Sequence, residues 1–267
     1  MRYSVSFSGG AGSYLAAKRC IQKFGKENVD LVFCDTKSED ADLYRLLDDA
    51  EKKLGIPIVR LADGRDIWQT FRDKKYLGNS RIDPCSDELK RKVLDKHRKE
   101  HYDQSNTTIV IGYTWDEPHR YERFEKIMSK KGWKTYAPMM EKPFLYKEEM
   151  LDEMIADGIR PPRLYALGAK HNNCGGGCVK AGQAHWKWAY HAIPDVFQHW
   201  KKKEQEMREY IGKDVSMMKQ VINGEKKTLT LAELERRIIE NESIDMFDFG
   251  ACSCFSNDTD EMGGVKG

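Results

Sequence analysis

Short apolar runs alternate with amphipathic stretches through the first half of the chain. Apolar runs that predict strands cover residues 2–7, 29–34, 57–61 and 107–111. Stretches with apolar side chains at helical spacing cover residues 16–24, 39–54 and 89–101. Strands that alternate with helices predict an α/β fold, a doubly wound and mainly parallel sheet with helices on both faces. Ligands of such sheets bind at the carboxyl ends of the strands.

The second half of the chain follows a different pattern. Helical periodicity covers residues 147–157, 197–211 and 229–242, and the segments between them are irregular. Thr230 followed by Glu233 predicts a capping box at the start of the last helix. We therefore expect three parts. These are an α/β domain over residues 1–137, a helical, cysteine-bearing region over 138–255 that packs on it, and a flexible tail over 256–267.

Composition changes this picture in three ways. The 267 residues include 45 basic and 43 acidic side chains, so the net charge of +2 gives no general case for a nucleic-acid partner. The chain has no apolar run long enough to span a membrane and no signal-peptide pattern at its start, so we expect a cytoplasmic protein without a membrane partner. Seven cysteines in that compartment favour metal binding or catalysis over disulfides.

A glycine- and serine-rich turn separates the first strand from the first helix, within SFSGGAGSYLAAKR (residues 6–19). The unpaired N–H groups of a helix N-terminus favour an anion at such a junction. Gly9 and Gly10 let a phosphate approach the backbone, and Ser8 and Ser13 add hydroxyl donors. The alternative is an ordinary tight turn between strand and helix.

The pattern S-G-G-x-x-S behind a first strand resembles the PP-loop of the ATP pyrophosphatase superfamily. The resemblance implies ATP or an adenylyl sulfate as ligand, Mg²⁺, and in many members an adenylate intermediate with release of pyrophosphate. The usual loop has Asp where this chain has Gly12. The loop residues that this resemblance assigns to the nucleotide are Ser6, Ser8, Gly9, Gly10, Gly12 and Ser13.

Two further segments resemble the phosphoadenylyl-sulfate reductase branch of that superfamily. Asp35 and Thr36 follow the second strand, and this position implies that they lie near adenine and ribose. NSRIDPCSDELKRK (residues 79–92) matches a Cys-x-x-x-x-Lys element with Cys85 and Lys90. Cations beside Cys85 would lower its pKa and favour the thiolate. The alternative is a small buried cysteine before an amphipathic helix.

The fourth predicted strand leads into GYTWDEPHRYER, which begins at Gly112. Gly112 would let a ligand lie close to the backbone. Glu117, Arg120 and Arg123 are candidates for binding phosphate or a carboxylate substrate, although each of them is also typical of a solvated helix.

Two cysteine pairs stand in the second half. Cys174 and Cys178 lie in HNNCGGGCVKAGQ, and Cys252 and Cys254 lie in FGACSCF. If the second segment folds back, four thiolates suit a [4Fe–4S] cluster or Zn²⁺, and the spacing does not distinguish them. The alternatives are unlinked buried cysteines or a redox disulfide. Cys20 and Cys34 follow apolar patterns and are expected in the core.

Aromatic and basic residues alternate in GQAHWKWAYHAIPDVFQHWKKKEQEMREY (residues 182–210). Stacking aromatics beside lysines are typical of single-stranded nucleic-acid platforms. The helical spacing of Trp186, Tyr190, Ile193 and Phe197 favours a packed core instead.

The combined motifs resemble a set of bacterial and phage proteins that are similar to phosphoadenylyl-sulfate reductases. The Glu-Cys-Gly-Leu-His element of true reductases is absent from this chain. Sulfur-inserting members of the superfamily pair a PP-loop with an iron–sulfur cluster, and they imply an ATP-dependent adenylating sulfur transfer to a nucleic-acid base or small molecule. Cys85, Lys90 and Arg120 would be the catalytic residues. The alternatives are a reductase of adenylyl sulfates and a zinc-stabilised nucleotide-binding ligase or sensor.

Overall fold

The computed structural model describes residues 1–250 and contains one five-stranded parallel sheet and one hairpin. The order of the parallel strands is β3-β2-β1-β4-β5, with β1 at the centre, where Val5 is in register with Leu31 on one side and with Val110 on the other. The strands are β1 (Arg2–Ser6), β2 (Val29–Asp35), β3 (Ile58–Ala62), β4 (Thr107–Val110) and β5 (Lys134–Tyr136), followed by the antiparallel pair β6 (Met218–Ile222) and β7 (Glu225–Leu229).

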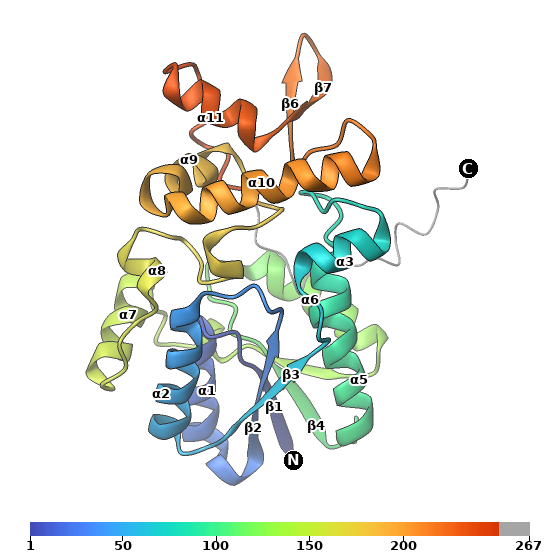
Figure 1. Ribbon diagram of the computed structural model, residues 1–267. Coiled ribbons are helices and arrows are strands. Elements are labelled where there is room, and N and C mark those ends of the chain that lie inside the picture. The colour runs from blue at the N-terminus through green and yellow to red at the C-terminus, as the bar shows by residue number, and fades with distance from the viewer. Residues whose placement is uncertain (251–267) are drawn as a thin grey trace.

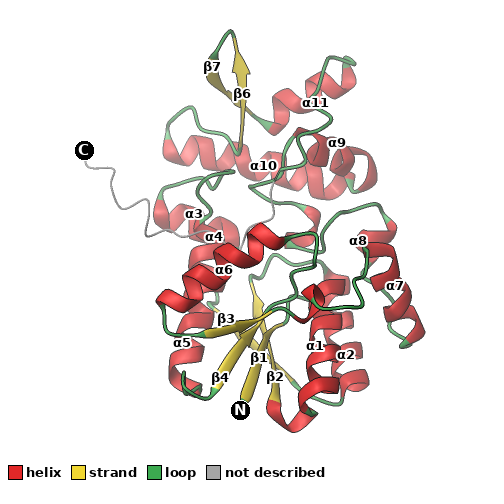
Figure 2. Cartoon of the chain, turned by 180° about the vertical axis from the view of Figure 1, so that it is seen from behind, coloured by secondary structure: helices red, strands yellow, loops and turns green. Residues whose placement is uncertain are grey.

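Helices cover both faces of this sheet (Figures 1 and 2). The strand order changes direction at β1, so the helices that connect β1, β2 and β3 lie on one face and the helices on either side of β4 lie on the other; the predicted doubly wound α/β fold is confirmed. The helices are α1 (Ala11–Phe24), α2 (Ala41–Leu54), α3 (Ile67–Lys74), α4 (Pro84–Ser86), α5 (Lys92–His101), α6 (Pro118–Lys130), α7 (Lys147–Ala156), α8 (Arg163–Ala166), α9 (Gln183–Ala192), α10 (Pro194–Ile211) and α11 (Leu231–Ile239). Single turns are η1 (Lys26–Asn28), η2 (Asp87–Arg91), η3 (Pro138–Met140) and η4 (Cys174–Gly176).

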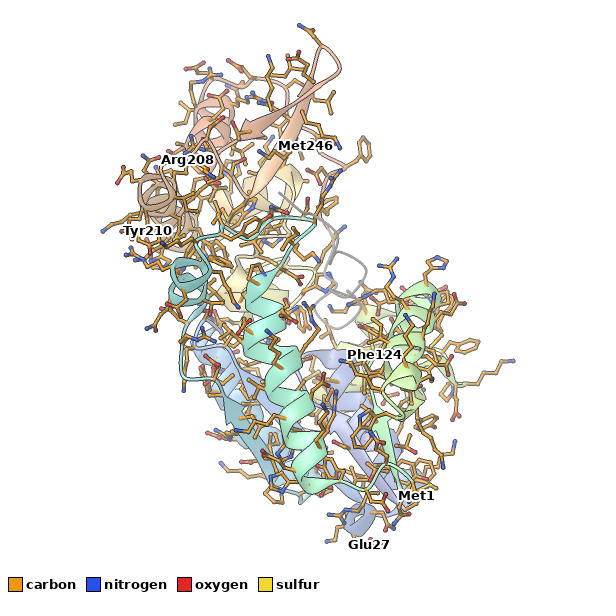
Figure 3. The ribbon with its side chains drawn as sticks, turned by 90° about the vertical axis from the view of Figure 1, so that its right-hand side faces the viewer. Met1, Glu27, Phe124, Arg208, Tyr210 and Met246 are labelled. Carbon is orange, nitrogen blue, oxygen red and sulfur yellow. The ribbon has the colours of Figure 1, made fainter. Side chains whose placement is uncertain are left out.

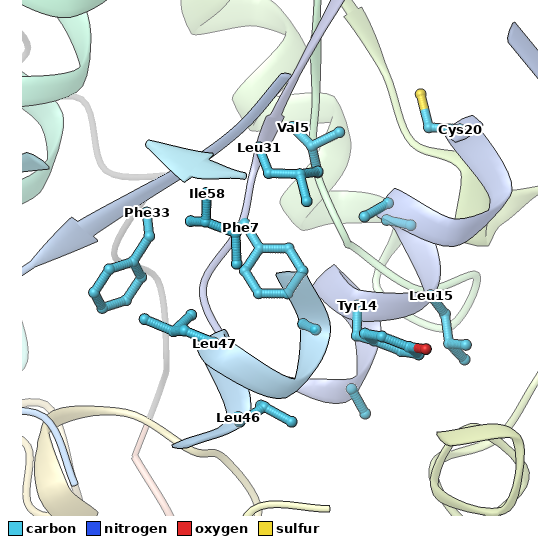
Figure 4. Packing of buried hydrophobic residues seen from close by; sticks show 14 of the residues in the cluster. Val5, Phe7, Tyr14, Leu15, Cys20, Leu31, Phe33, Leu46, Leu47 and Ile58 are labelled. Atoms are coloured by element: carbon cyan, nitrogen blue, oxygen red, sulfur yellow. The ribbon is translucent and has the colours of Figure 1, made fainter. Parts of the chain in front are cut away.

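The main core lies between the sheet and helices α1 and α2 (Figure 4). Phe7 after β1 packs with Tyr14 and Leu15 of α1 and with Leu46 and Leu47 of α2, and all five side chains are buried. Full burial of such a side chain contributes about 1.5–3 kcal/mol, so this face holds α1 and α2 firmly on the strands.

A second layer of apolar side chains covers the opposite face. Phe124 and Met128 of α6 pack on Ile109 of β4, and Leu94 of α5 packs on Val32 of β2. Figure 3 labels Phe124 on α6, with Met1 and Glu27 at the amino end of the sheet. Because both faces are covered, β2 and β4 are buried along almost their whole length.

Helices α9, α10 and α11 form a separate layer beyond the carboxyl ends of the strands (Figure 1). Trp186, Phe197 and Trp200 are at most 4% exposed in the core of this layer, and the ring centroids of Trp186 and Trp200 are 5.3 Å apart. The expected packed core of residues 182–210 is therefore confirmed. Trp186, Phe197 and Trp200 are thus unavailable for stacking on bases.

A buried carboxylate fixes the hairpin to this helical layer. Glu204 of α10 is 1% exposed and accepts the backbone N–H groups of Met217 (3.0 Å) and Leu231 (2.7 Å). Burial raises the pKa of Glu204 above its ordinary value. One side chain thus holds the entry to β6 and the start of α11 in place.

Some elements differ from those that the sequence patterns predict. β5, α3, α6 and the hairpin were not predicted, because short or charged segments give weak periodicity. The last helix is α11 rather than residues 229–242, and the Thr230 hydroxyl caps it by accepting the Glu233 N–H at 3.2 Å. The division of the chain at residues 137 and 138 stays a prediction. Among residues 1–250, each helix is too short or too polar to cross a lipid bilayer.

The first helix begins earlier than predicted, at Ala11 instead of near Ser13 or Ala16, so Gly12 lies in its first turn. That turn packs directly on the backbone that follows β4. A Cβ atom at Gly12 would lie 2.6 Å from the carbonyl oxygen of Gly112, and one at Gly112 would lie 2.7 Å from the backbone of Gly12. Glycine is thus required on both sides of the contact.

We expect Gly12→Ala to lower the free energy of unfolding by about 2 kcal/mol, because the added methyl group forces the helix away from the sheet. Urea denaturation measures this change. Gly158→Ala is the control, because it has no atom within 4 Å of the added carbon and carries only the strain of its φ of +79°. A Gly12→Ala protein as stable as the wild type would contradict the close contact.

Candidate functional site

A cavity of about 580 Å³ opens at the carboxyl ends of β1 and β4. The loop after β1 forms one wall, with Ser8, Gly10 and Ser13. Residues of the second half of the chain, including Lys147 and His171, form the opposite wall. The cavity lies where the strand order reverses, which is the position that ligands of doubly wound sheets occupy, and its volume is ample for a nucleotide.

The loop after β1 has the backbone of an anion-binding turn. Gly9 has a φ of +74°, and Gly10 is the extended residue that precedes α1. The Ser13 hydroxyl bonds the N–H (3.2 Å) and the carbonyl oxygen (2.9 Å) of Gly10 and lies 3.2 Å from the Ser8 hydroxyl. The N-terminus of α1 is therefore fixed with its first N–H groups at the cavity, as phosphate binding requires.

Residues from the second half of the chain contact this loop directly. The Asn172 amide donates to the Gly9 carbonyl oxygen at 3.1 Å, and the Tyr165 hydroxyl accepts the Ala11 N–H at 3.4 Å. The Lys147 ammonium lies 3.8 Å from the centre of the Tyr165 ring. The sequence interpretation missed Tyr165 and Lys147, because neither belongs to a recognisable motif. Asn172 belongs to the HNNC segment but was not assigned a role.

The wall behind β4 carries a paired arginine. Arg120 forms an ion pair with Glu117, whose carboxylate also accepts the Thr114 hydroxyl at 3.0 Å. Arg120, Glu117 and Gly112 all line the cavity, whereas Arg123 does not. The guanidinium of Arg120 lies 4.5 Å from the centre of the Tyr113 ring.

Lys90 stands between this cavity and a second, smaller one. It lies on η2, a wider π-helical turn that continues into α5, and its side chain is 9% exposed. Its ammonium lies 3.3 Å from the Glu39 carboxylate. Lys90 lines both cavities. A π-turn in a longer helix is frequently found at a functional site.

The smaller cavity has a volume of only about 10 Å³, which is the space of about one water molecule. Cys85, Cys174 and Cys178 line it, with Thr36 and Lys180 beside them. Cys85 lies in this cavity and not among the residues that line the larger one, where Lys90 and Arg120 are found. The three residues predicted to be catalytic are therefore divided between two adjoining cavities.

The loop that carries Cys174 and Cys178 has a left-handed backbone. Cys174 has a φ of +49° and Gly175 one of +63°. The Lys180 N–H donates to the Cys178 sulfur at 3.4 Å. The hydrogen bond to Cys178, together with burial and the Glu39 carboxylate, raises the pKa of the Cys174 thiol well above its ordinary value. Two sulfur atoms are thus held side by side, facing the small cavity.

The remaining predicted residues have structural partners. Ser6 accepts a hydrogen bond from the buried Arg98 at 3.1 Å, and it also lines the larger cavity. Asp35 accepts the Tyr44 hydroxyl at 2.9 Å and pairs with Lys37 at 3.1 Å. Asp35 and Thr36 do not line the larger cavity, so their contact with adenine or ribose stays a prediction.

The predicted four-cysteine site is only partly covered by the structure. Cys252 and Cys254 lie outside the described residues. Among residues 1–250, no three Cys, His, Asp or Glu side chains are close enough to hold a metal ion. Cys20 and Cys34 are buried in the core as expected, and burial raises the pKa of each thiol to about 12.

Lys147 is a partly desolvated cation in the wall of the larger cavity. Burial lowers its pKa from 10.5 to about 8, and the nearby Glu117 and Glu148 carboxylates only partly offset this effect. Its ammonium donates to the Lys170 carbonyl oxygen at 2.8 Å. A bound phosphate near Lys147 would favour the charged form.

Comparisons with known proteins give limited matches. No family model matches the chain. An uncharacterised protein of Methanocaldococcus jannaschii is 30% identical over 127 residues, which are 48% of this chain and 25% of that protein. The chain thus spans about a quarter of that relative's length. The crystal structure of a phosphoadenylyl-sulfate reductase from Candida auris, in a phosphate complex, is similar with a TM-score of 0.44 and 15% identity, over 65% of this chain and 80% of that one.

The pKa of Lys147 predicts a pH dependence of nucleotide binding. Lys147 carries its proton below about pH 8 and loses it above. Loss of its charge removes one contact with phosphate worth about 1 kcal/mol. We therefore expect the Kd for ATP to rise about fivefold between pH 7 and pH 9. Calorimetry at several pH values measures this change. Lys147→Met removes the dependence in that window, and Lys126→Met, on the exposed face of α6, keeps it. A dependence that persists in Lys147→Met would contradict the assignment.

Proposed function

We propose that this chain is an adenine-nucleotide-dependent enzyme that adenylates an acceptor and transfers sulfur to it. One observation carries the proposal: Lys90 lines both the cavity at the glycine-rich loop and the cavity of the three thiols. An enzyme that joins nucleotide activation to thiol chemistry requires two such sites in contact.

The nucleotide would bind with its phosphates at the N-terminus of α1. The N–H groups of that turn and the Ser8 hydroxyl would donate to phosphate oxygens, and Lys90 and Arg120 would neutralise the charge that develops on pyrophosphate. Gly12 has no room for the Asp of the usual loop. The carboxylates of Asp116 and Glu117, which line the same cavity, are the candidates for contact with Mg²⁺.

The proposed reaction has two stages, adenylation of the acceptor and transfer of sulfur. An acceptor oxygen attacks the α-phosphorus of ATP, the bond to the bridging oxygen breaks, and pyrophosphate leaves. A sulfane-sulfur donor first transfers a sulfur atom to the Cys85 thiol and leaves a persulfide. The outer sulfur of that persulfide attacks the activated acceptor carbon, the carbon–oxygen bond breaks, and AMP leaves with the oxygen. A reducing thiol then attacks the Cys85 sulfur, forms a disulfide with it and releases the thiolated acceptor. Lys90 stands between the two cavities, where it would interact first with pyrophosphate and then with AMP.

The Cys174 and Cys178 side chains are of the type that binds zinc or an iron–sulfur cluster. Cys174 and Cys178 present two soft donors side by side, and the Lys180 N–H already bonds one sulfur, as amides do around iron–sulfur clusters. Cys252 and Cys254 would complete the predicted set. A cluster bound there would supply redox or sulfur chemistry, whereas Zn²⁺ would be structural.

The paired thiols also support a second candidate, a reductase of adenylyl sulfates. A thiolate would attack the sulfonate sulfur and release the adenine nucleotide. The neighbouring thiol would then attack the first cysteine sulfur, form a disulfide and release sulfite. The hydrogen bond between Cys174 and Cys178 favours this candidate. Sulfite release from phosphoadenylyl sulfate distinguishes it from sulfur transfer.

Replacing Lys90 tests the nucleotide site. We expect Lys90→Ala to raise the Kd for ATP about tenfold or more, because a charge-assisted contact to phosphate is lost. Lys92→Ala is the matched control: it lies two residues along, its side chain is 59% exposed, and it pairs with Glu88 instead. Equal affinities of the two variants, measured by calorimetry, would exclude Lys90 from phosphate binding.

Metal analysis tests the thiol site. We expect protein purified without oxygen to contain iron and acid-labile sulfide at about four of each per chain. Cys174→Ser and Cys178→Ser should lose both, and Cys20→Ser, which changes a core thiol, should keep them. About one zinc per chain would favour the structural site and the ligase or sensor alternative. Protein with neither metal nor sulfide would favour the reductase.

A further inference from the structure

Glu39 joins the two cavities, although it is not among the residues that line either of them. It lies in the loop between β2 and α2, and its side chain is 3% exposed. One carboxylate oxygen accepts the Thr36 hydroxyl at 2.9 Å and lies 3.3 Å from the Lys90 ammonium. The other accepts the backbone N–H of Cys174 at 2.8 Å.

The buried Glu39 carboxylate thus contacts two different elements, η2 and η4. The Lys90 ammonium belongs to η2 and reaches the nucleotide cavity. The Cys174 N–H belongs to η4, where the cysteine backbone has a left-handed φ that is unfavourable for a residue with a Cβ atom. A hydrogen bond to a carboxylate is charge-assisted, and here it holds that conformation in place.

The neighbouring charges do not duplicate this arrangement. Lys37 pairs with Asp35. Arg163 pairs with Asp40, the residue that follows Glu39 in the chain. Gly175 packs on the same loop, since a Cβ atom there would lie 3.3 Å from the Ser38 carbonyl oxygen. The thiol loop therefore rests on the loop that carries Glu39.

We infer that Glu39 is a positioning residue that couples nucleotide binding to the conformation of the thiol loop. The inference rests on the proposed function. Phosphates that enter the larger cavity attract the Lys90 ammonium away from Glu39. The carboxylate then bonds the Cys174 N–H with less competition, and the thiol loop tightens. Linkage requires the reverse effect as well, so the state of the thiol loop changes nucleotide affinity.

Hydrogen–deuterium exchange of the peptide that contains residues 171–180 tests this coupling. In the wild type, saturating ATP should slow exchange at Cys174 about fivefold. In Glu39→Gln, basal exchange should be faster, and ATP should no longer change it, although calorimetry still detects ATP binding. Glu204→Gln, which alters another buried carboxylate with two backbone donors, should keep the response to ATP. A response that persists in Glu39→Gln would overturn the inference.

A second comparison needs no nucleotide and separates this inference from the proposed function. Without ATP, Glu39→Gln and Glu39→Gln/Lys90→Met should show the same fast exchange at Cys174, whereas Lys90→Met alone should exchange more slowly than the wild type, because the Lys90 ammonium no longer competes for Glu39. The double variant replaces Lys90 together with Glu39, so the ammonium does not remain buried after its carboxylate partner is removed, and the comparison stays usable if Glu39→Gln alone is unstable. A wild type that binds no adenine nucleotide would refute the proposed function. Unchanged exchange at Cys174 in both Glu39 variants would refute the inference that Glu39 holds the thiol loop.

Discussion

The backbone contact between the first turn of α1 and the end of β4 determines where the site can form. Gly12 and Gly112 approach so closely that neither position has room for a side chain. This contact directs the N-terminal N–H groups of α1 at the space beyond β1 and β4. Because the large core under α1 and α2 fixes the same helix from the other side, the N-terminal end of α1 is held rigidly.

The position of Lys90 decides how the site is divided. A buried ammonium needs a partner, and Glu39 supplies one from the loop after β2. The same carboxylate holds the backbone of Cys174, so one charged pair stabilises both a wall of the larger cavity and the thiol loop. A second ion pair, between Lys180 and Asp83 at 3.6 Å, lies beside the thiol cavity and is also buried.

The helical layer beyond the strand ends supplies the apolar surroundings of the thiols. Trp200 lines the thiol cavity while it packs against Trp68 and Trp186. Tyr165 and Asn172, in the segment that leads to this layer, reach the glycine-rich loop. The second half of the chain is therefore part of both cavities, and the α/β sheet alone would leave them open.

The sequence by itself determined the elements whose patterns are local. These are β1, β2, β3 and β4 of the parallel sheet, the glycine-rich turn before α1, and the burial of Trp186 and Phe197 at helical spacing. Only the tertiary structure decided that Cys85 lies with Cys174 rather than with Arg120, and that Glu39 joins Lys90 to the thiol loop. The physical reason is that periodicity reports which face of an element is buried, whereas these contacts join residues about 50 to 135 positions apart through three separate loops.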